Sequence, residues 1–183
     1  MTRLLAALAV CLIAAGCGSK PQQVGRSHGI GIDPPVAAPA FLLRDQSGAL
    51  IGPQRYRGEW TVVTFLYTHC PDVCPLIASQ LIAAQRKALG LRVVAVSVDP
   101  KGDTRAAVRS FLRQHHAGPR FRYVTGSRAA LAPVWRKYHI AALPGPASTV
   151  SHNAVSIVID KTGRERFLLD SQLTARDVLA AVS

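Results

Sequence analysis

Two cysteines are the residues best suited to chemistry in this 183-residue sequence. Cys70 and Cys74 are four positions apart, so their side chains fall on one face if the second half of the segment is helical. A pair of thiolates is a soft donor set, which selects Cu(I), Zn or iron–sulfur clusters over hard cations. The same pair could instead form a disulfide or a redox couple, and the residues alone leave these alternatives open.

A buried strand and a helix must position the two cysteines. Residues 60–67 are apolar and β-branched, which is typical of a central strand covered on both faces. Apolar residues then recur every three or four positions from 77 to 89, a spacing that predicts an amphipathic helix ending at Gly90. The cysteines would lie where the strand meets the positive end of the helix dipole, so we expect both thiols to lose their protons easily.

The rest of the chain alternates strands with helices. Further strands are predicted at 92–98, 121–124, 154–159 and 164–169. Further helices are predicted to begin at Asp103 or Thr104, at Ser127 and at Thr174, and Pro133 should kink the second of these or delay its start. A β-hairpin over 41–51 comes first. This order predicts an α/β fold with a thioredoxin-like mixed sheet flanked by helices and an N-terminal β-hairpin extension.

His152 is the best candidate for a third ligand in such a fold. It lies in a predicted loop, 143–153, where a thioredoxin-like chain returns to the cysteine turn. An imidazole beside two thiolates would complete a trigonal site suited to copper. The other histidines of the folded region are expected to be packing or solvated residues and not ligands: His69, His115, His116 and His139.

The N-terminus has the features of an export signal. Arg3 precedes an apolar run, 4–15, that is too short to span a bilayer. The small residues before Cys17 resemble the lipobox of bacterial lipoproteins, in which the cysteine is lipidated and becomes the new N-terminus. We therefore expect residues 1–16 to be a signal peptide and Cys17 to anchor the chain to the membrane.

The segment that follows the anchor is rich in Gly, Pro, Ser and Ala without a period. This composition predicts that residues 17–40 are a lipidated anchor and flexible linker, and that residues 41–183 are the folded domain. Cys11 would be removed with the signal peptide. Cys70 and Cys74 would then be the only thiols of the folded domain.

The sequence carries a net charge of +12, from 22 Lys and Arg against 10 Asp and Glu. Such an excess raises nucleic acid as a partner, but the basic residues are scattered singly and no aromatic–basic recognition motif accompanies them. The export signal also argues against nucleic acid. Anionic lipid or an acidic patch on a partner protein fits the charge better. We expect a monomer, since the chain is long enough to bury its own core.

Residues 65–75, FLYTHCPDVCP, closely resemble the signature of the Sco (SenC) family. The likeness covers about residue 41 to the C-terminus and continues through four shorter pieces: 97–100 (SVDP), 103–104 (DT), 125–127 (TGS) and His152 ahead of 157–160 (IVID). Members of this family are membrane-tethered thioredoxin-like proteins that deliver copper to the binuclear copper site of cytochrome c oxidase.

The resemblance implies that Cys70, Cys74 and His152 are copper ligands. It implies a copper chaperone outside the cytoplasm, with the copper-receiving subunit of the oxidase or another copper carrier as its partner. One departure is Ser151, since the family commonly has an acidic residue before the ligand histidine. Asp72 matches the family, either as a helix cap or as a residue that tunes the thiols.

A thiol–disulfide oxidoreductase is the alternative function, with Cys70 and Cys74 as a redox-active pair that reduces a partner's cysteines. Two features favour the chaperone, which is not an enzyme. Three residues separate the cysteines, where thioredoxins have two. The segment before Ala154 also lacks the proline with which thioredoxins dock a substrate chain.

Overall fold

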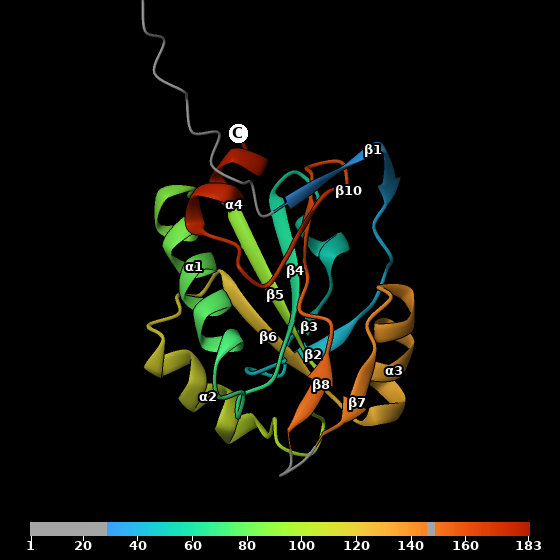
Figure 1. The fold of residues 1–183 in the computed structure, drawn as a ribbon, viewed down its shortest axis with the longest axis vertical. Helices are drawn as coiled ribbons and strands as arrows, with labels where there is room; N and C mark the ends of the chain where they lie inside the picture. The colour runs from blue at the N-terminus through green and yellow to red at the C-terminus, as the bar shows by residue number, and fades with distance from the viewer. Residues whose placement is uncertain (1–28, 146–148) are drawn as a thin grey trace, which may run out of the picture.

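The computed structural model describes residues 29–145 and 149–183. The predicted signal peptide, Cys17 and the first part of the predicted linker lie outside these residues, so the anchor stays a prediction. The described chain forms a mixed α/β fold built on an eight-stranded sheet in the order β1-β10-β9-β4-β5-β6-β2-β3 (Figure 1). Its strands are β1 (Gly29–Ala37), β2 (Leu43–Asp45), β3 (Leu50–Ile51), β4 (Trp60–Leu66), β5 (Leu91–Ser97), β6 (Phe121–Thr125), β9 (Ser156–Ile159) and β10 (Arg164–Leu169).

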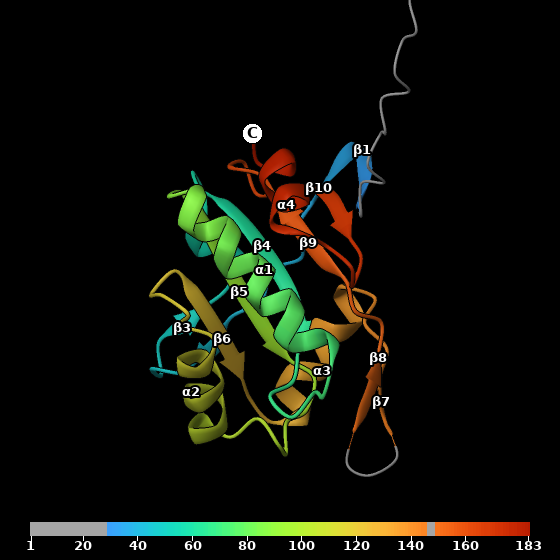
Figure 2. The same cartoon turned by 60° about the vertical axis from the view of Figure 1, so that its left-hand side comes forward.

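Helices cover both faces of this sheet. They are α1 (Val73–Lys87), α2 (Arg105–Gln114), α3 (Arg128–Lys137) and α4 (Ala175–Ala181), with a short 3-10 helix, η1 (Pro53–Tyr56), before β4. Figures 1 and 2 show α1, α2 and α4 on one face and α3 on the other. The parallel connections from β4 to β5 through α1 and from β5 to β6 through α2 are crossovers of the same hand, so both helices lie on one face. The chain then returns through α3, on the other face, to the antiparallel strand β9.

The central strand is β4, as its apolar sequence predicts. It pairs in parallel with β5 and antiparallel with β9, and Val62, Val63 and Phe65 are completely buried. Because β4 has a neighbouring strand on each side and helices on each face of the sheet, its sequence needs no alternation of apolar and polar residues. The carboxyl ends of β4 and β5 therefore emerge together, with Leu66 beside Ser97, at one edge of a rigid sheet.

The linker prediction is wrong for its last part. Strand β1 pairs antiparallel with β10 in two stretches, 29–31 and 36–37, separated by an irregularity around Asp33 and two prolines. Prolines lack the N–H that a ladder needs, so the composition resembles that of a linker. The strand forms because β10, more than a hundred residues later, offers an open edge that local sequence does not show.

The hairpin over 41–51 is confirmed as β2 and β3, and β2 also pairs with β6, so the hairpin extends the main sheet. Helix α3 begins after Ser127, as predicted, and Pro133 does not delay its start. The Ser127 hydroxyl accepts the N–H of Ala130 and fixes the first turn before the proline is reached.

A second hairpin occupies the segment predicted to be a loop, 143–153. Strands β7 (Ala142–Pro144) and β8 (Val150–His152) pair antiparallel as a separate two-stranded sheet. Each strand has only three residues and carries Pro, Ser or exposed apolar side chains, so no alternation was visible. Figure 2 shows this hairpin projecting beside the edge where β4 ends, with the loop after β4 between it and α2.

Candidate metal centre

Both cysteines lie at the carboxyl end of β4, as predicted, and both are free thiols. Cys70 is in the loop and Cys74 is in the first turn of α1, where neither is more than 7% exposed. Asp72 caps the helix, with its carboxylate accepting the N–H of Val73. The Cys74 N–H donates to the Cys70 sulfur at 3.4 Å, so the first turn of the helix points a donor at that sulfur.

This arrangement lowers the pKa of Cys70 to about 6. The largest cause is a hydrogen bond from the Cys74 thiol, and the backbone N–H groups of Asp72 and Cys74 add to it against the opposing effect of burial. The same hydrogen bond and deeper burial raise the pKa of Cys74. The expectation that both thiols ionise easily is therefore wrong for Cys74, because one thiolate beside it disfavours a second.

Replacement of Cys74 by Ala should make Cys70 a slower nucleophile. The largest cause of its low pKa is then gone, so the pKa rises from about 6 toward the ordinary value of 9.0 and the thiolate is depleted at pH 7. We expect alkylation of Cys70 by iodoacetamide at pH 7 to slow by about tenfold, measured by mass spectrometry on the reduced chain. Cys74→Ser keeps a hydroxyl donor and is the control. A Cys74→Ala rate equal to that of the control would contradict the assigned cause.

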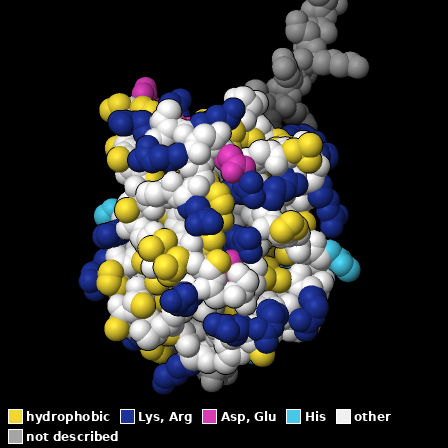
Figure 3. Space-filling view, turned by 180° about the vertical axis from the view of Figure 1, so that it is seen from behind, with side chains coloured by type: hydrophobic (Ala, Val, Ile, Leu, Met, Phe, Trp, Pro, Cys, Tyr) yellow, Lys and Arg dark blue, Asp and Glu magenta, His cyan; other side chains and the backbone are white. Residues whose placement is uncertain are grey.

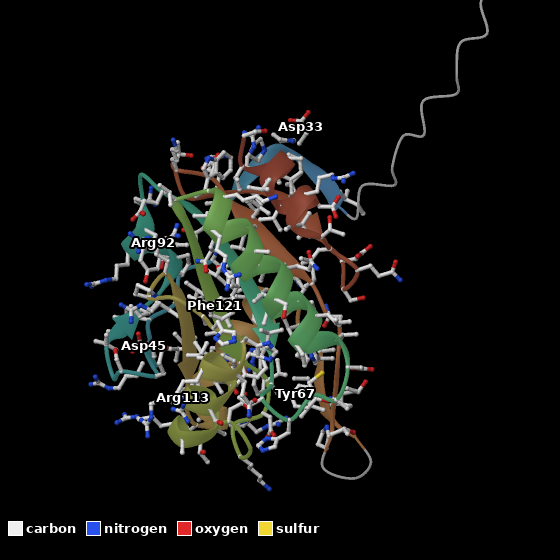
Figure 4. The ribbon with its side chains drawn as sticks, turned by 90° about the vertical axis from the view of Figure 1, so that its left-hand side faces the viewer. Asp33, Asp45, Tyr67, Arg92, Arg113 and Phe121 are labelled. Atoms are coloured by element: carbon white, nitrogen blue, oxygen red, sulfur yellow. The ribbon has the colours of Figure 1, made fainter. Side chains whose placement is uncertain are left out.

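Tyr67 links the thiols to His152. Its hydroxyl lies against the Cys70 sulfur and the backbone of Val150, and burial is the first cause of its raised pKa. Its ring meets the His152 ring edge to face, with centroids 6.0 Å apart. Figure 4 shows Tyr67 beside the sulfur atoms at this end of the sheet. The sequence singled out neither Tyr67 nor its contacts, since a tyrosine ending a buried strand is ordinary.

His152 is half-buried, and burial lowers its pKa, which favours the neutral imidazole that binds metals. Its Nδ1 lies 3.3 Å from the carbonyl oxygen of Asn153. If Nδ1 carries the proton and donates to that oxygen, Nε2 keeps its lone pair for a metal.

The three predicted ligands are neighbours but not a finished cluster. Within 29–145 and 149–183, no group of three His, Cys, Asp or Glu side chains is close enough to hold a metal ion. The thiols are in contact, and Tyr67 touches Cys70 with its hydroxyl and His152 with its ring. The donor chemistry fits copper, because two sulfurs and a neutral imidazole are ligands that copper prefers. Binding would require His152 to approach the sulfurs.

Asn153 fixes the base of the hairpin that carries His152. Its side-chain oxygen accepts the Ala141 N–H at 2.9 Å, and its amide nitrogen donates to the His139 carbonyl oxygen at 3.1 Å. His139 has φ of 55°, which turns that carbonyl toward the hairpin. One carboxamide thus joins the end of α3 to the end of β8. No local sequence pattern indicates this role of Asn153, because it depends on a contact across the predicted loop.

Asn153→Ala should weaken copper binding by about tenfold, because the backbone that places the imidazole loses both clamps. The melting temperature of the metal-free chain should fall by no more than about 4 °C. Gln46→Ala is the matched control, since Gln46 also holds a backbone N–H, that of Tyr123, with a side-chain amide. Competition titration with a chromophoric chelator measures the affinity. Equal losses in the two variants would exclude a positioning role for Asn153.

Asp103 holds the loop in front of the thiols and does not cap a helix. The N-cap of α2 is Thr104, whereas the Asp103 carboxylate is only 3% exposed. It accepts the Thr68 N–H at 2.7 Å and three hydroxyl groups, from Thr68, Ser97 and Tyr123. One feature of the sequence hints at this role: Asp103 and Thr104 are both residues that can cap a helix, and a helix uses only one N-cap.

Among residues 29–145 and 149–183, no other histidine joins the two sulfurs in a group that could hold a metal ion. His115 is the C-cap of α2 and packs on Phe111 at 4.5 Å, with His116 after it, and His139 follows the C-cap of α3. His69 is next to Cys70 in the sequence, but its Nδ1 lies 3.2 Å from the Thr68 hydroxyl.

The helices of the described residues are also too short or too polar to span a bilayer.

Known proteins share this fold and parts of this sequence. The mitochondrial SCO2 homologue of Bos taurus is 32% identical over 112 residues, which are 58% of this chain and 41% of that protein. The copper-bound ScoI structure of Bradyrhizobium japonicum has 29% identity and a TM-score of 0.66 over 79% of this chain and 96% of that one. The apo Sco1 solution structure of Thermus thermophilus has 24% identity and a TM-score of 0.71 over 87% of this chain and 96% of that one.

The SCO1/SenC family description matches residues 32–183, which include all of the sheet except the first residues of β1. The match covers the paired thiols, the Asp103 network and the hairpin that ends at His152. Copper, the ion expected from the sequence, is the metal in the Bradyrhizobium relative. With a thioredoxin-like sheet and the family's description running through nearly its whole described length, the chain is a member of the SCO1/SenC family.

Proposed function

We propose that this chain is a copper chaperone that binds one copper ion through Cys70, Cys74 and His152 and delivers it for assembly of the binuclear copper site of cytochrome c oxidase. The observation that carries the proposal is the pair of hydrogen-bonded thiols at the start of α1, one ring away from a neutral imidazole. Membership of the SCO1/SenC family supports the cargo. The partner is the copper-receiving subunit of the oxidase or another copper carrier.

The two thiols have different roles in loading. Cys70 is already largely thiolate near pH 7, since its pKa is about 6, so it is the first sulfur available to the ion. Cys74 must release its proton when the second bond forms, because its pKa is raised. Transfer follows by ligand exchange, in which donors of the recipient replace the chain's ligands one at a time. Apart from the Cys74 S–H bond, which is broken when copper binds and remade when it leaves, no covalent bond of the protein changes in this cycle.

Copper titration of the reduced chain tests the proposal. We expect one copper per chain, sulfur-to-copper absorption, and release of about one proton per ion near pH 7 from Cys74. Zn titration under the same conditions is the control for general soft-metal binding. Failure to bind copper in preference to zinc would reject the chaperone.

The oxidoreductase remains a second function because a low-pKa thiol beside a protonated one is also the arrangement of a thiol reductant. Here the Cys70 thiolate would attack a partner disulfide, and Cys74 would displace the reduced partner as the internal disulfide forms. Insulin reduction with dithiothreitol as the electron source distinguishes the two. Turnover without copper binding favours this function.

We also propose that the chain is held on the outer side of the cell membrane by lipid at Cys17. The motif before Cys17 supports this anchor. Cys17→Ser should move the protein from the membrane fraction to the soluble exported fraction. Equal membrane retention of the variant would reject the anchor.

A further inference from the structure

Helix α2 carries three exposed arginines in one row. Arg105, Arg109 and Arg113 are four residues apart, so they lie above one another on a ten-residue helix. Val108, Phe111 and Leu112 are buried on the other side. We call the three residues the α2 arginine row. No acidic residue occurs anywhere in α2.

The α2 arginine row works against the helix that carries it. Arg105 is the first helical residue, where the positive end of the helix dipole disfavours a cation. Like charges at a spacing of four also repel one another. Within 29–145 and 149–183, none of the three has an ion pair, so no opposite charge offsets this cost.

Most other arginines among the described residues do have partners within the fold. Arg92 pairs with Glu59 at 2.7 Å and Arg122 with Asp45 at 3.1 Å. Other basic side chains donate to backbone carbonyl oxygens: Arg44, Arg57, Arg120, Lys137 and Arg164. Figure 3 shows basic side chains over the face seen from behind, with few acidic ones among them. The α2 arginine row differs because its three cations share one helix face and lack such partners.

A hollow beside the row is suited to a carboxylate. It has a volume of about 290 Å³, and Arg109, Arg113 and His116 lie on its wall. No Asp or Glu lines it. The side-chain oxygen of Gln46, also on the wall, already accepts the Tyr123 N–H. An entering carboxylate would therefore meet guanidinium donors without a competing anion.

The α2 arginine row begins at the thiol end of the molecule. Thr104, the N-cap, follows Asp103, whose carboxylate holds Thr68 two residues before Cys70. The loop with the thiols lies between α2 and the β7–β8 hairpin, whereas β1 lies at the opposite end (Figure 2). Figure 4 shows Arg113 on the side of this end away from the hairpin. A partner on the row would reach the thiol end of the molecule at its Arg105 side.

We propose that the α2 arginine row docks an acidic segment of a protein partner and so brings that partner to the thiols. The inference rests on the proposed function in one respect: the purpose of docking is taken to be copper exchange. The row fits a protein segment better than a bilayer, because eight residues of helix span about 12 Å and end at a hollow of side-chain size. Opposite charges would speed the encounter and fix its orientation.

Binding of fluorescein-labelled decaglutamate tests the docking surface by fluorescence anisotropy. All proteins carry Cys17→Ser, so that no lipid is attached. The row variant is Arg105→Gln, Arg109→Gln and Arg113→Gln. The control is Lys87→Gln, Lys161→Gln and Arg176→Gln, which removes the same charge from exposed residues elsewhere. We expect the row variant to bind about tenfold more weakly at low salt and the control to stay within about twofold of the parent.

Thermal melting adds a second readout. The row variant should melt at the same or a higher temperature than the parent, because repulsion along α2 is relieved. A lower melting temperature would show that the arginines serve the fold and would overturn the inference. Equal weakening of the two variants, or none in either, would overturn it as well, since general charge would then explain binding.

Vesicles of phosphatidylcholine with 30% phosphatidylserine, compared with phosphatidylcholine alone, separate a membrane from a protein partner. Binding to anionic vesicles that depends on the row, with unchanged peptide binding, would overturn the inference in favour of a lipid surface. Copper titration of the same variants keeps the two proposals distinct. The row variant should still bind one copper ion. If the parent binds the peptide through the row but binds no copper, the copper-chaperone proposal is rejected and the docking surface is not.

Discussion

Copper binding should be lost when either Cys70 or Cys74 is replaced by serine. The two sulfurs are in contact at the start of α1, and His152 does not form a finished ligand group with them, so one sulfur with the imidazole cannot hold the ion. We expect the affinity to fall on the order of a hundredfold or more. The measurement is competition with a chromophoric Cu(I) chelator under reducing conditions.

His152→Ala should have a smaller effect, about tenfold, because water or an outside ligand can take one position. His115→Ala is the matched control, since His115 packs on Phe111 at the end of α2, and its affinity should stay within about twofold of the parent. A His152→Ala protein with parental affinity and spectrum, beside a His115→Ala protein that loses copper, would place the site elsewhere. Copper retained by a double cysteine variant would reject the thiol site altogether.

Elements with an unbroken local pattern could be predicted from the sequence. Strand β4 consists of apolar and β-branched residues, and α1 repeats its apolar residues every three or four positions, so the local pattern alone indicates the type of each element. The order of such elements was enough for the thioredoxin-like sheet. The position of Cys70 and Cys74 followed, since both lie at the junction of two well-patterned elements.

The parts that were missed depend on residues far apart in the sequence. Strand β1 exists because β10 accepts it, although its own prolines are typical of a linker. Strands β7 and β8 have three residues each, too few for a period. The place of His152 relative to the sulfurs is set by Tyr67 and by the Asn153 clamp, neither of which any local pattern predicts.

The ionisation of the thiols shows the same limit. A helix start beside two cysteines predicts two acidic thiols, and this holds for Cys70. Cys74 differs because it is completely buried and donates to its neighbour, so its proton stabilises the other sulfur. Which of the two thiols donates the hydrogen bond depends on how deeply each is buried. That burial depends on the conformation of the loop from 68 to 72, which the sequence pattern does not predict.

Asp103→Ala should be the most destabilising single change near the site. The carboxylate accepts the Thr68 N–H and hydroxyls of Thr68, Ser97 and Tyr123, so its removal leaves buried donors without an acceptor. We expect the free energy of unfolding to fall by about 3–5 kcal/mol, measured by urea denaturation of the reduced chain. The loop it holds carries Cys70, so the rate of Cys70 alkylation at pH 7 should fall as well.

Asp45→Ala separates the two effects of that change. Asp45 is equally buried and accepts the N–H groups of Ser47 and Ala49, but it is the last residue of β2, before the turn to β3. Asp45→Ala should lower the free energy of unfolding by a similar amount and leave the reactivity of Cys70 unchanged.

Burial raises the pKa of Asp103 above 3.8, so its protonated form contributes stability that is lost as the pH rises through that raised pKa. The stability gap between the parent and Asp103→Asn should therefore narrow as the pH rises above 3.8, and a gap that widens would mean that the hydrogen bonds to the carboxylate outweigh its burial.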